Sequence, residues 1–369
     1  MKTFFYSGAF DPFSVLDTEA VFNTLLDGSY NKVVIGIELD SKRPALFSLA
    51  KRTEMIKQSL EWYAKANFPV NYEHLIERIS IVSYHGLPIY EAKKHGADMF
   101  LIATDETKTY NVKFSLSRQI ARNKLSSQVG HVLYVREQSP DNLAKSIKLC
   151  YKHHEYIMLA QFVTPPVHNM IMEELLEKQY FDCCRQSGIS WEDFCSQMST
   201  RAYHNLSHIA YMLDKYSVFK AHTTKQIDFA EEKNFKAAIF FHDYIKDDEE
   251  KSFEASKLGE TTKPLFMATK HFEPLFDYDD MSEPEQLIID LDLAILNDKV
   301  LYENYAKSIR VEYKHIPYDE YVTARKEILE KLEDVIEHRT SFTDMQKQRA
   351  FKNIDRELEY LDCGSWPCW

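Results

Sequence analysis

Residues 32–38 read KVVIGIE, and every position between Lys32 and Glu38 is apolar or glycine. An apolar run without alternation is typical of a strand in a parallel sheet, because helices cover both faces of such a sheet. Similar short runs occur at 2–6, 79–83, 99–103 and 131–135. Helical patterns separate them, at 17–27, 49–66, 88–95 and 115–123. Strands that alternate with helices form βαβ units, so the first 150 residues predict an α/β domain.

The alternation ends after about residue 150. The segments that suit helices from there on are 155–180, 200–217, 230–247, 283–297, 299–313 and 318–337. Few strand signals lie between them, which predicts an all-α domain. Pro165–Pro166 predicts the end of a helix near the boundary, because the residue before a proline disfavours the helical conformation.

The composition limits the class of partner. The chain has 369 residues and a formal net charge of −12. Duplex nucleic acid binds to basic surfaces, so we expect no nucleic-acid partner. A phosphorylated small molecule is still compatible with this charge, because a bound cation reverses the local field.

Targeting signals are absent from the sequence pattern. No stretch approaches 18 consecutive apolar residues, and the opening MKTFFYSGAF lacks the apolar core of a signal peptide. The six cysteines include no CxxC pair, which predicts reduced thiols. We therefore expect a cytoplasmic protein without a membrane partner.

The stretch 240–247, FFHDYIKD, places two ionisable side chains at the end of an apolar run. Burying an unpaired charge is costly, so such groups are usually paired, hydrogen-bonded or bound to a metal. His242 and Asp243 therefore become candidates for a site. Whether they are paired, hydrogen-bonded or bound to a metal depends on which other side chains the fold brings close to them.

Two other segments offer matching side chains. His204 and His208 are four residues apart and share a face if their segment is helical. Asp290 and Asp292 interrupt the apolar run IIDLDLAIL at 288–296. Imidazoles and carboxylates together suit one divalent ion, which could be Mn²⁺, Fe²⁺, Zn²⁺, Co²⁺ or Mg²⁺. The plainer alternatives are a helix-face role for His208 and an N-cap role for Asp290.

The order of these segments carries a resemblance. The segments in question are YHNLSHI, FFHDYIKD, EEKSFEAS, DLDLAIL and IRVEY. Over about residues 172–357 they resemble the HD superfamily of metal-dependent phosphohydrolases. The resemblance implies an all-helical fold with His204, His242, Asp243 and Asp292 as metal ligands. Asp292 is preferred to Asp290 because it matches the second aspartate of the family pattern.

The implied chemistry is attack on phosphorus by a water molecule that the metal activates. Asp243 would orient or deprotonate this water. If the helix that carries it continues, Asp247 and Glu250 follow at helical steps, and one of them would protonate the leaving group. Phosphate also needs cationic or polar contacts, and the side chains considered for them are Arg201, His208, Lys246, Lys270, His271, Arg310 and Arg325. We select His208, Lys246, Arg310 and Arg325, although surface salt bridges are the commoner use of any single arginine.

The N-terminal stretch YSGAFDPFSVLD, residues 6–17, runs from a strand through Gly8 and Asp11–Pro12 into a helix. This arrangement can place phosphate near a helix N-terminus. Over about residues 2–150 the chain resembles the nucleotidyltransferase superfamily, specifically phosphopantetheine adenylyltransferases. The resemblance implies a Rossmann-like parallel sheet and a weak nucleotide-binding set, namely Gly8, Phe10, Asp11 and Lys42.

The chain departs from that family at the positions that would carry adenylyl transfer. Leu16–Asp17 replaces the family's Gly-His, whose histidine contacts the phosphates of ATP. Leu101–Asp105 reads LIATD where the family has Arg-Gly, and the late serine-rich segment is weakly matched by Ser139–Asn142. A carboxylate at Asp17 would repel a triphosphate, so we expect a degenerate site.

These observations predict a Rossmann-like domain at 1–150, a helical linker at 151–171, an HD-type domain at 172–357 and a tail at 358–369. The function expected is hydrolysis of a phosphate ester or anhydride of a nucleotide-like or CoA-like molecule. The first domain would bind ligand or assemble subunits, which makes a homo-oligomer possible. The alternatives are a bifunctional adenylyltransferase and hydrolase, and a non-catalytic nucleotide sensor.

Overall fold

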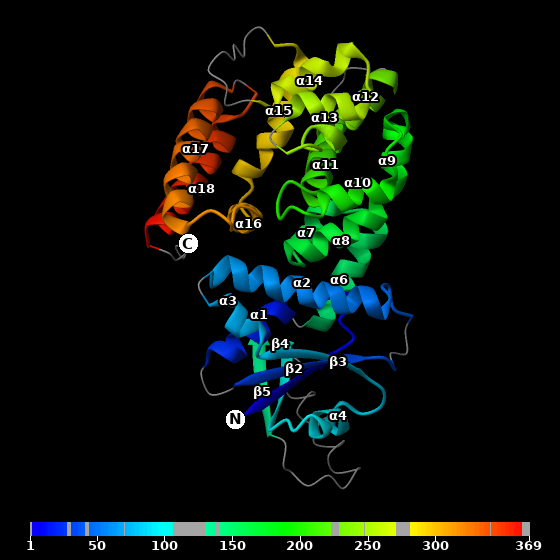
Figure 1. Ribbon diagram of the computed structural model, residues 1–369, viewed down its shortest axis with the longest axis vertical. Helices are drawn as coiled ribbons and strands as arrows, with labels where there is room; N and C mark the ends of the chain where they lie inside the picture. The colour runs from blue at the N-terminus through cyan, green and yellow to red at the C-terminus, as the bar shows by residue number, and fades with distance from the viewer. Residues whose placement is uncertain are drawn as a thin grey trace. The chain divides into compact units, whose positions relative to one another are not determined.

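The computed structural model contains two compact units, Met1–His168 and Asn169–Trp369 (Figure 1). The described residues are 2–27, 31–40, 44–69, 71–105, 130–136, 140–222, 229–246, 248–270, 281–339 and 341–363. The predicted helix at 115–123 and the end of the tail lie outside them. Residues 151–168, which the sequence analysis assigned to a linker, are part of the first unit.

A parallel sheet forms the centre of the first unit. Its strands are β1 (Thr3–Gly8), β2 (Lys32–Glu38), β3 (Ile79–Tyr84), β4 (Met99–Asp105) and β5 (Gly130–Arg136). They lie in the order β3-β2-β1-β4-β5, and every neighbouring pair is parallel. The expected α/β sheet is therefore confirmed.

Helices cover both faces of this sheet, as the apolar strands predict. Within the described residues, the helices of the first unit are α1 (Val15–Leu26), α2 (Leu49–Asn67), α3 (Tyr72–Ile76), α4 (Pro88–Lys94), α6 (Pro140–His153) and α7 (Tyr156–Ala160). Phe4 and Ile35 pack in a core with α1 and α2, whereas Phe5 and Val34 pack with α4 on the other face (Figure 1). At Gly36 a Cβ atom would lie 2.4 Å from the Phe5 ring, so the sheet requires glycine there.

The described part of the second unit contains helices and no strand. Its helices are α8, which begins in the first unit (Pro165–Leu175), α9 (Glu177–Cys184), α10 (Trp191–Met198), α11 (Leu206–His222), α12 (Phe229–Phe241), α13 (Glu249–Ser256), α14 (Lys263–Ala268), α15 (Glu283–Leu293), α16 (Tyr302–Glu312), α17 (Tyr318–His338) and α18 (Asp344–Cys363). Among the described residues no helix has the length and apolarity to cross a membrane.

Two sequence expectations about helix ends are wrong. Pro165–Pro166 begins α8 rather than ending a helix, since proline is well accommodated in a first helical turn. The helix expected at 230–247 ends at Phe241. The carbonyl oxygen of Ile239, which the N–H of Asp243 would need in a continued helix, accepts a hydrogen bond from Nδ1 of His242. The Arg201 guanidinium binds the carbonyl oxygens of Asp243 and Tyr244 and so holds the turn that follows.

His168 gives the first unit a predicted dependence on pH. Its ring is buried, and burial lowers its pKa from 6.5 to about 4, although Nε2 donates to the Tyr156 carbonyl oxygen. As the pH falls from 6.5 towards 4, the unfolded chain gains a proton that the folded chain resists. Stability should therefore fall by about 2–3 kcal/mol between pH 7 and pH 4.5 through this residue alone.

Urea unfolding of His168→Gln and wild type at both pH values measures this contribution. The variant should lose about 2–3 kcal/mol less than wild type on acidification. His153→Gln, at an exposed position of α6, is the matched control and should behave as wild type. An equal pH dependence in wild type and His168→Gln would contradict the assignment.

Candidate metal centre

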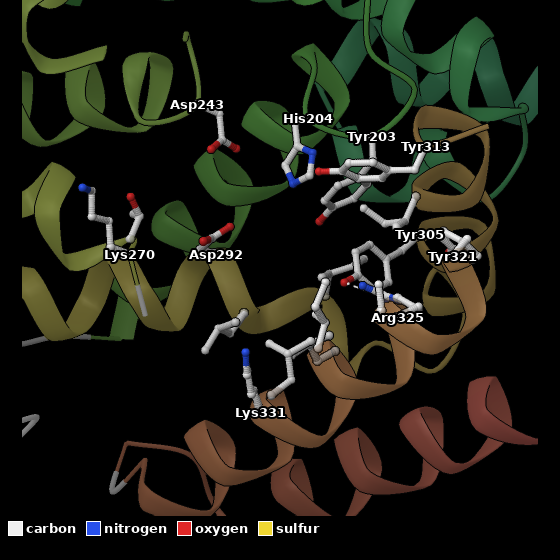
Figure 2. A pocket seen from close by; sticks show the side chains of 18 of the residues that line it. Tyr203, His204, Asp243, Lys270, Asp292, Tyr305, Tyr313, Tyr321, Arg325 and Lys331 are labelled. Carbon is white, nitrogen blue, oxygen red and sulfur yellow. Dashed lines mark hydrogen bonds between the residues drawn. The ribbon is translucent and has the colours of Figure 1, made fainter. Parts of the chain in front are cut away.

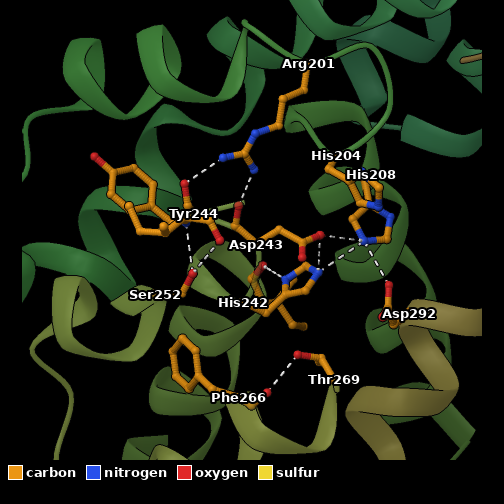
Figure 3. Close-up of polar contacts among 12 residues, drawn as sticks. Arg201, His204, His208, His242, Asp243, Tyr244, Ser252, Phe266, Thr269 and Asp292 are labelled. Carbon is orange, nitrogen blue, oxygen red and sulfur yellow. Dashed lines mark hydrogen bonds and ion pairs between the residues drawn. The ribbon is translucent and has the colours of Figure 1, made fainter. Parts of the chain in front are cut away.

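Three separate segments of the second unit meet at a cluster of two histidines and an aspartate. His208 lies on α11, His242 directly follows α12, and Asp292 lies on α15. Nε2 of His208 lies 3.2 Å from Nε2 of His242 and 3.0 Å from Oδ1 of Asp292 (Figure 3). One possible ligand atom from each residue lies within 4.8 Å of the others.

Asp243 extends this cluster. Its Oδ2 atom lies 2.9 Å from Nε2 of His242 and 3.8 Å from Nε2 of His208. Arg201 fixes the backbone behind the carboxylate, through the carbonyl of Asp243 and through that of Tyr244 at 2.8 Å (Figure 3). The Asp243 carboxylate is thereby held on the same side as the two imidazoles.

The donor set fits a divalent cation. His242 Nδ1 donates to the carbonyl oxygen of Ile239 at 2.9 Å, so in the neutral ring Nε2 presents its lone pair to the cluster. The side chains of His208 and His242 are each 1% exposed. Two buried ring nitrogens that face each other beside two carboxylates are well explained by a shared cation.

Electrostatics support the same assignment. Burial lowers the pKa of His242, but the carboxylates of Asp243 and Asp292 outweigh it and raise the pKa to about 9. Burial raises the pKa of Asp243, but His242 and the neighbouring imidazoles outweigh it and bring the pKa well below the ordinary range. The cluster therefore attracts positive charge, which a metal ion supplies in place of protons.

His204 occupies the wall of the adjoining cavity. Its Nδ1 atom lies 2.8 Å from Oε1 of Glu312, whose other oxygen accepts the backbone N–H groups of Tyr203 and His204. Burial raises the pKa of Glu312, but His204 outweighs it and lowers the pKa to about 2. The carboxylate thus fixes the imidazole orientation. The sequence analysis assigned His204 to the ligands and His208 to the substrate, whereas the structure places His208 in the cluster.

A cavity of about 650 Å³ adjoins the cluster. Its volume lies within the range of small-molecule sites. The charged and polar residues at its metal-facing end include Tyr203, His204, Asp243, Glu249, Lys270 and Asp292 (Figure 2). Lys270 Nζ lies 3.6 Å from Glu249, so one cation and several carboxylates meet here.

The proton donors expected from sequence are not brought to this cavity within the described residues. Glu250 is exposed and binds Lys263 at 2.8 Å, because α13 begins afresh at Glu249 after the turn that follows Phe241. Asp247 lies outside the described residues. Glu249, which the sequence analysis did not single out, lines the cavity instead. Asp248 caps the N-terminus of α13, and a helix start predicted at this aspartate would have pointed to Glu249.

The expected phosphate-binding cations have other partners. Arg310 donates to the carbonyls of Tyr313 and Ile316, and Lys246 lies 3.5 Å from Glu312; neither described side chain lines the cavity. Arg325 does line it, but its guanidinium is held by Glu357 at 2.7 Å. Lys270, which the sequence analysis considered as a phosphate-binding residue but did not select, lines the cavity near the cluster.

In the first unit, the loop expected to bind a nucleotide is filled by its own side chains. Phe10 is buried, and its ring lies 2.9 Å from where a Cβ on Gly8 would stand. Asp11 accepts the backbone N–H groups of Leu46 and Phe47 at 2.8 and 2.9 Å. Asp11 also binds Lys148 Nζ at 2.7 Å. Lys42 lies outside the described residues.

The N-terminus of α1 is also occupied by the chain itself. Ser14 and Asp17 form a reciprocal capping box, and Tyr6 donates its hydroxyl to Asp17. The N–H of Val15 donates to the carbonyl oxygen of Phe162 at 3.0 Å. These amides would otherwise be the anion-binding groups of a helix N-terminus. Asp17 therefore has a structural role at the position where the resembled family has its histidine.

Sequence comparison supports a weak relationship between the N-terminal part of the chain and a family of nucleotidyltransferases. Phosphopantetheine adenylyltransferase of Francisella philomiragia is 24% identical over 170 residues, which are 46% of this chain and 94% of the relative. The protein of that name from Francisella tularensis subsp. novicida is 22% identical over 162 residues, 44% of this chain and 90% of the relative. The similarity lies in the N-terminal part. No family model matches the chain.

Proposed function

We propose that the helical unit is an HD-type metal-dependent phosphohydrolase. The observation that carries this proposal is the meeting of His208, His242, Asp243 and Asp292 beside a cavity large enough for a small molecule. Their order, His, His-Asp and Asp, is that of the resemblance described above, although the resemblance implied His204 in the place that His208 takes here. One divalent cation, Mn²⁺, Fe²⁺, Zn²⁺, Co²⁺ or Mg²⁺, is the cofactor that the donor set suits.

The reaction is hydrolysis of a phosphate ester or anhydride. A bound divalent cation supplies a water molecule of lowered pKa and positive charge beside the phosphoryl oxygens. Asp243 orients this water, because Arg201 holds its backbone and His242 its carboxylate. Lys270 lies at the same end of the cavity as Asp243 and Asp292 (Figure 2), where its charge would stabilise the phosphoryl oxygens as the leaving group departs.

For the first unit we propose ligand binding or subunit assembly rather than adenylyl transfer. Its similarity to phosphopantetheine adenylyltransferases favours a nucleotide-like or CoA-like ligand for the whole protein. The internal bonds of Asp11, Ser14 and Asp17 argue against adenylyl transfer, since the groups that would bind the triphosphate already have partners.

Asp243→Asn tests the hydrolase proposal with little change in shape. The variant should release phosphate from a panel of nucleotides and CoA-like esters about 100-fold more slowly than wild type, the usual size of a general-base effect. Phosphate release with added Mn²⁺ is the measurement. Asp334→Asn, exposed on α17, should match wild type.

Two other results would contradict these proposals. Equal activity and equal metal content in wild type and Asp243→Asn would remove the basis of the hydrolase assignment. Pyrophosphate release from ATP and phosphopantetheine by the full chain would instead favour the bifunctional alternative.

A further inference from the structure

The cavity has two chemically different ends. Asp243, Asp292 and Lys270 lie together at one end, and Tyr305, Tyr321 and Arg325 lie at the other (Figure 2). The phosphoryl group belongs at the first end in the proposed function. The second end must therefore hold the organic part of the substrate.

Apart from Arg325 and Lys331, the rest of the lining is mainly apolar and aromatic. The aliphatic residues that line the cavity include Leu293, Ile295, Leu296, Ile309, Ile316 and Ile328. The rings that line the cavity are Tyr203, Tyr305, Tyr313 and Tyr321. The described lining residues include no asparagine, glutamine or serine, and the hydroxyl of Thr269 donates to the Phe266 carbonyl. Apart from tyrosine hydroxyls, few groups are available to read the polar edges of a nucleobase.

The charges of the lining restrict the number of phosphates. Arg325 contributes little net charge, because Glu357 binds its Nε at 2.7 Å and its Nη2 at 3.2 Å. Lys270 is accompanied by Glu249 and faces Asp243 and Asp292. A triphosphate chain is normally held by several cationic and backbone donors together with its metal. Lys331 also lines the cavity, so Lys270, Lys331 and the paired Arg325 stand against the carboxylates of Asp243, Glu249 and Asp292 (Figure 2). The described lining has no excess of cations for a triphosphate and suits a single phosphoryl group.

We infer that the substrate is the phosphate monoester of an uncharged, largely apolar alcohol, and not a nucleoside triphosphate. The inference rests on the proposed function for the reaction. The water oxygen forms a bond to phosphorus, and the bond between phosphorus and the alcohol oxygen breaks. One water proton is transferred to the alcohol and the other remains with inorganic phosphate.

Turnover of matched esters by the full chain with Mn²⁺ tests the preference. Each buried methylene contributes roughly fourfold to binding, so kcat/KM for hexyl phosphate should exceed that for ethyl phosphate by at least about 10-fold. Hexyl phosphate should also exceed AMP and ATP by about 10-fold or more. Fastest turnover of ATP would overturn the inference while leaving the hydrolase proposal intact.

A binding measurement separates the two proposals. Hexylphosphonate and ethylphosphonate have no P–O bond to a leaving alcohol, and calorimetry with Mn²⁺ should show hexylphosphonate binding at least about 10-fold more tightly. Ile328→Glu, at a cavity position that is 37% exposed, should reduce this ratio at least fivefold. Met345→Glu, 58% exposed on α18, should leave the ratio unchanged.

Equal binding of the two phosphonates, or an unchanged ratio in Ile328→Glu, would overturn the inference. A persistent preference for hexylphosphonate without phosphate release from any ester would support the apolar subsite and overturn the hydrolase proposal. The two failures are therefore distinguishable.

Discussion

Replacing His208 by alanine should abolish stoichiometric metal binding and lower phosphate release by about 1,000-fold or more. A metal ion provides several kcal/mol of transition-state stabilisation in such reactions, and every 1.4 kcal/mol is tenfold in rate. His208 is central to the cluster, since its Nε2 lies 3.2 Å from His242 and 3.0 Å from Asp292. Its removal leaves one imidazole, too few for tight binding of a transition-metal ion.

Metal analysis after gel filtration measures this effect directly, alongside phosphate release. His222→Ala is the matched control, because it lies on the same helix with an exposed ring. His204→Ala should retain more metal than His208→Ala, since His204 lies on the cavity wall and is held by Glu312. If His204→Ala loses the metal and His208→Ala keeps it, the ligand set derived from the sequence is correct and the cluster proposed from the structure is not.

The contrast between the two histidines shows where sequence periodicity stops being informative. A spacing of four residues places side chains on one face only within a continuous helix. Helix α11 begins at Leu206, so His208 lies on it and His204 precedes it. Glu312, more than 100 residues away, accepts the backbone N–H groups at this point and decides the geometry. No local pattern contains that information.

The sheet, by contrast, was predictable because its signal is local. Its strands are buried on both faces, so each is marked by its own apolar residues, as in β2. Helix ends were less predictable, because they depend on distant partners. The turn that follows α12 is held by Arg201, which binds carbonyls 42 and 43 residues further along the chain. Because α13 begins anew after this turn, Glu249 lines the cavity, whereas Glu250 binds Lys263 away from it.

Glu357→Ala should destabilise the helical unit by about 3–5 kcal/mol, because it leaves a buried arginine without its counter-charge. Arg325 is 4% exposed and Glu357 is 1% exposed. The carboxylate binds Arg325 Nε at 2.7 Å and the Tyr302 hydroxyl at 2.7 Å. Removal of the carboxylate therefore leaves both a buried charge and a buried hydroxyl unsatisfied.

Urea unfolding followed by far-UV circular dichroism measures the loss. Glu303→Ala removes a more exposed ion pair with Lys307, at 2.8 Å, and should cost less than about 1 kcal/mol. The double variant Arg325→Met with Glu357→Leu should recover most of the stability, since apolar side chains of similar size can replace a buried pair.

The same variants decide what Arg325 does. The sequence suggested that it binds substrate phosphate, and in that case Glu357→Ala would free its guanidinium and lower KM with little effect on unfolding. The two bonds to Glu357 and the bond to the Tyr305 hydroxyl at 3.0 Å predict the reverse. A stable Glu357→Ala protein with tighter substrate binding would contradict a structural role for the pair. An unstable Glu357→Ala protein would support the structural role of the pair. Lys270 would then be the cation that faces the phosphate among the described lining residues near the cluster.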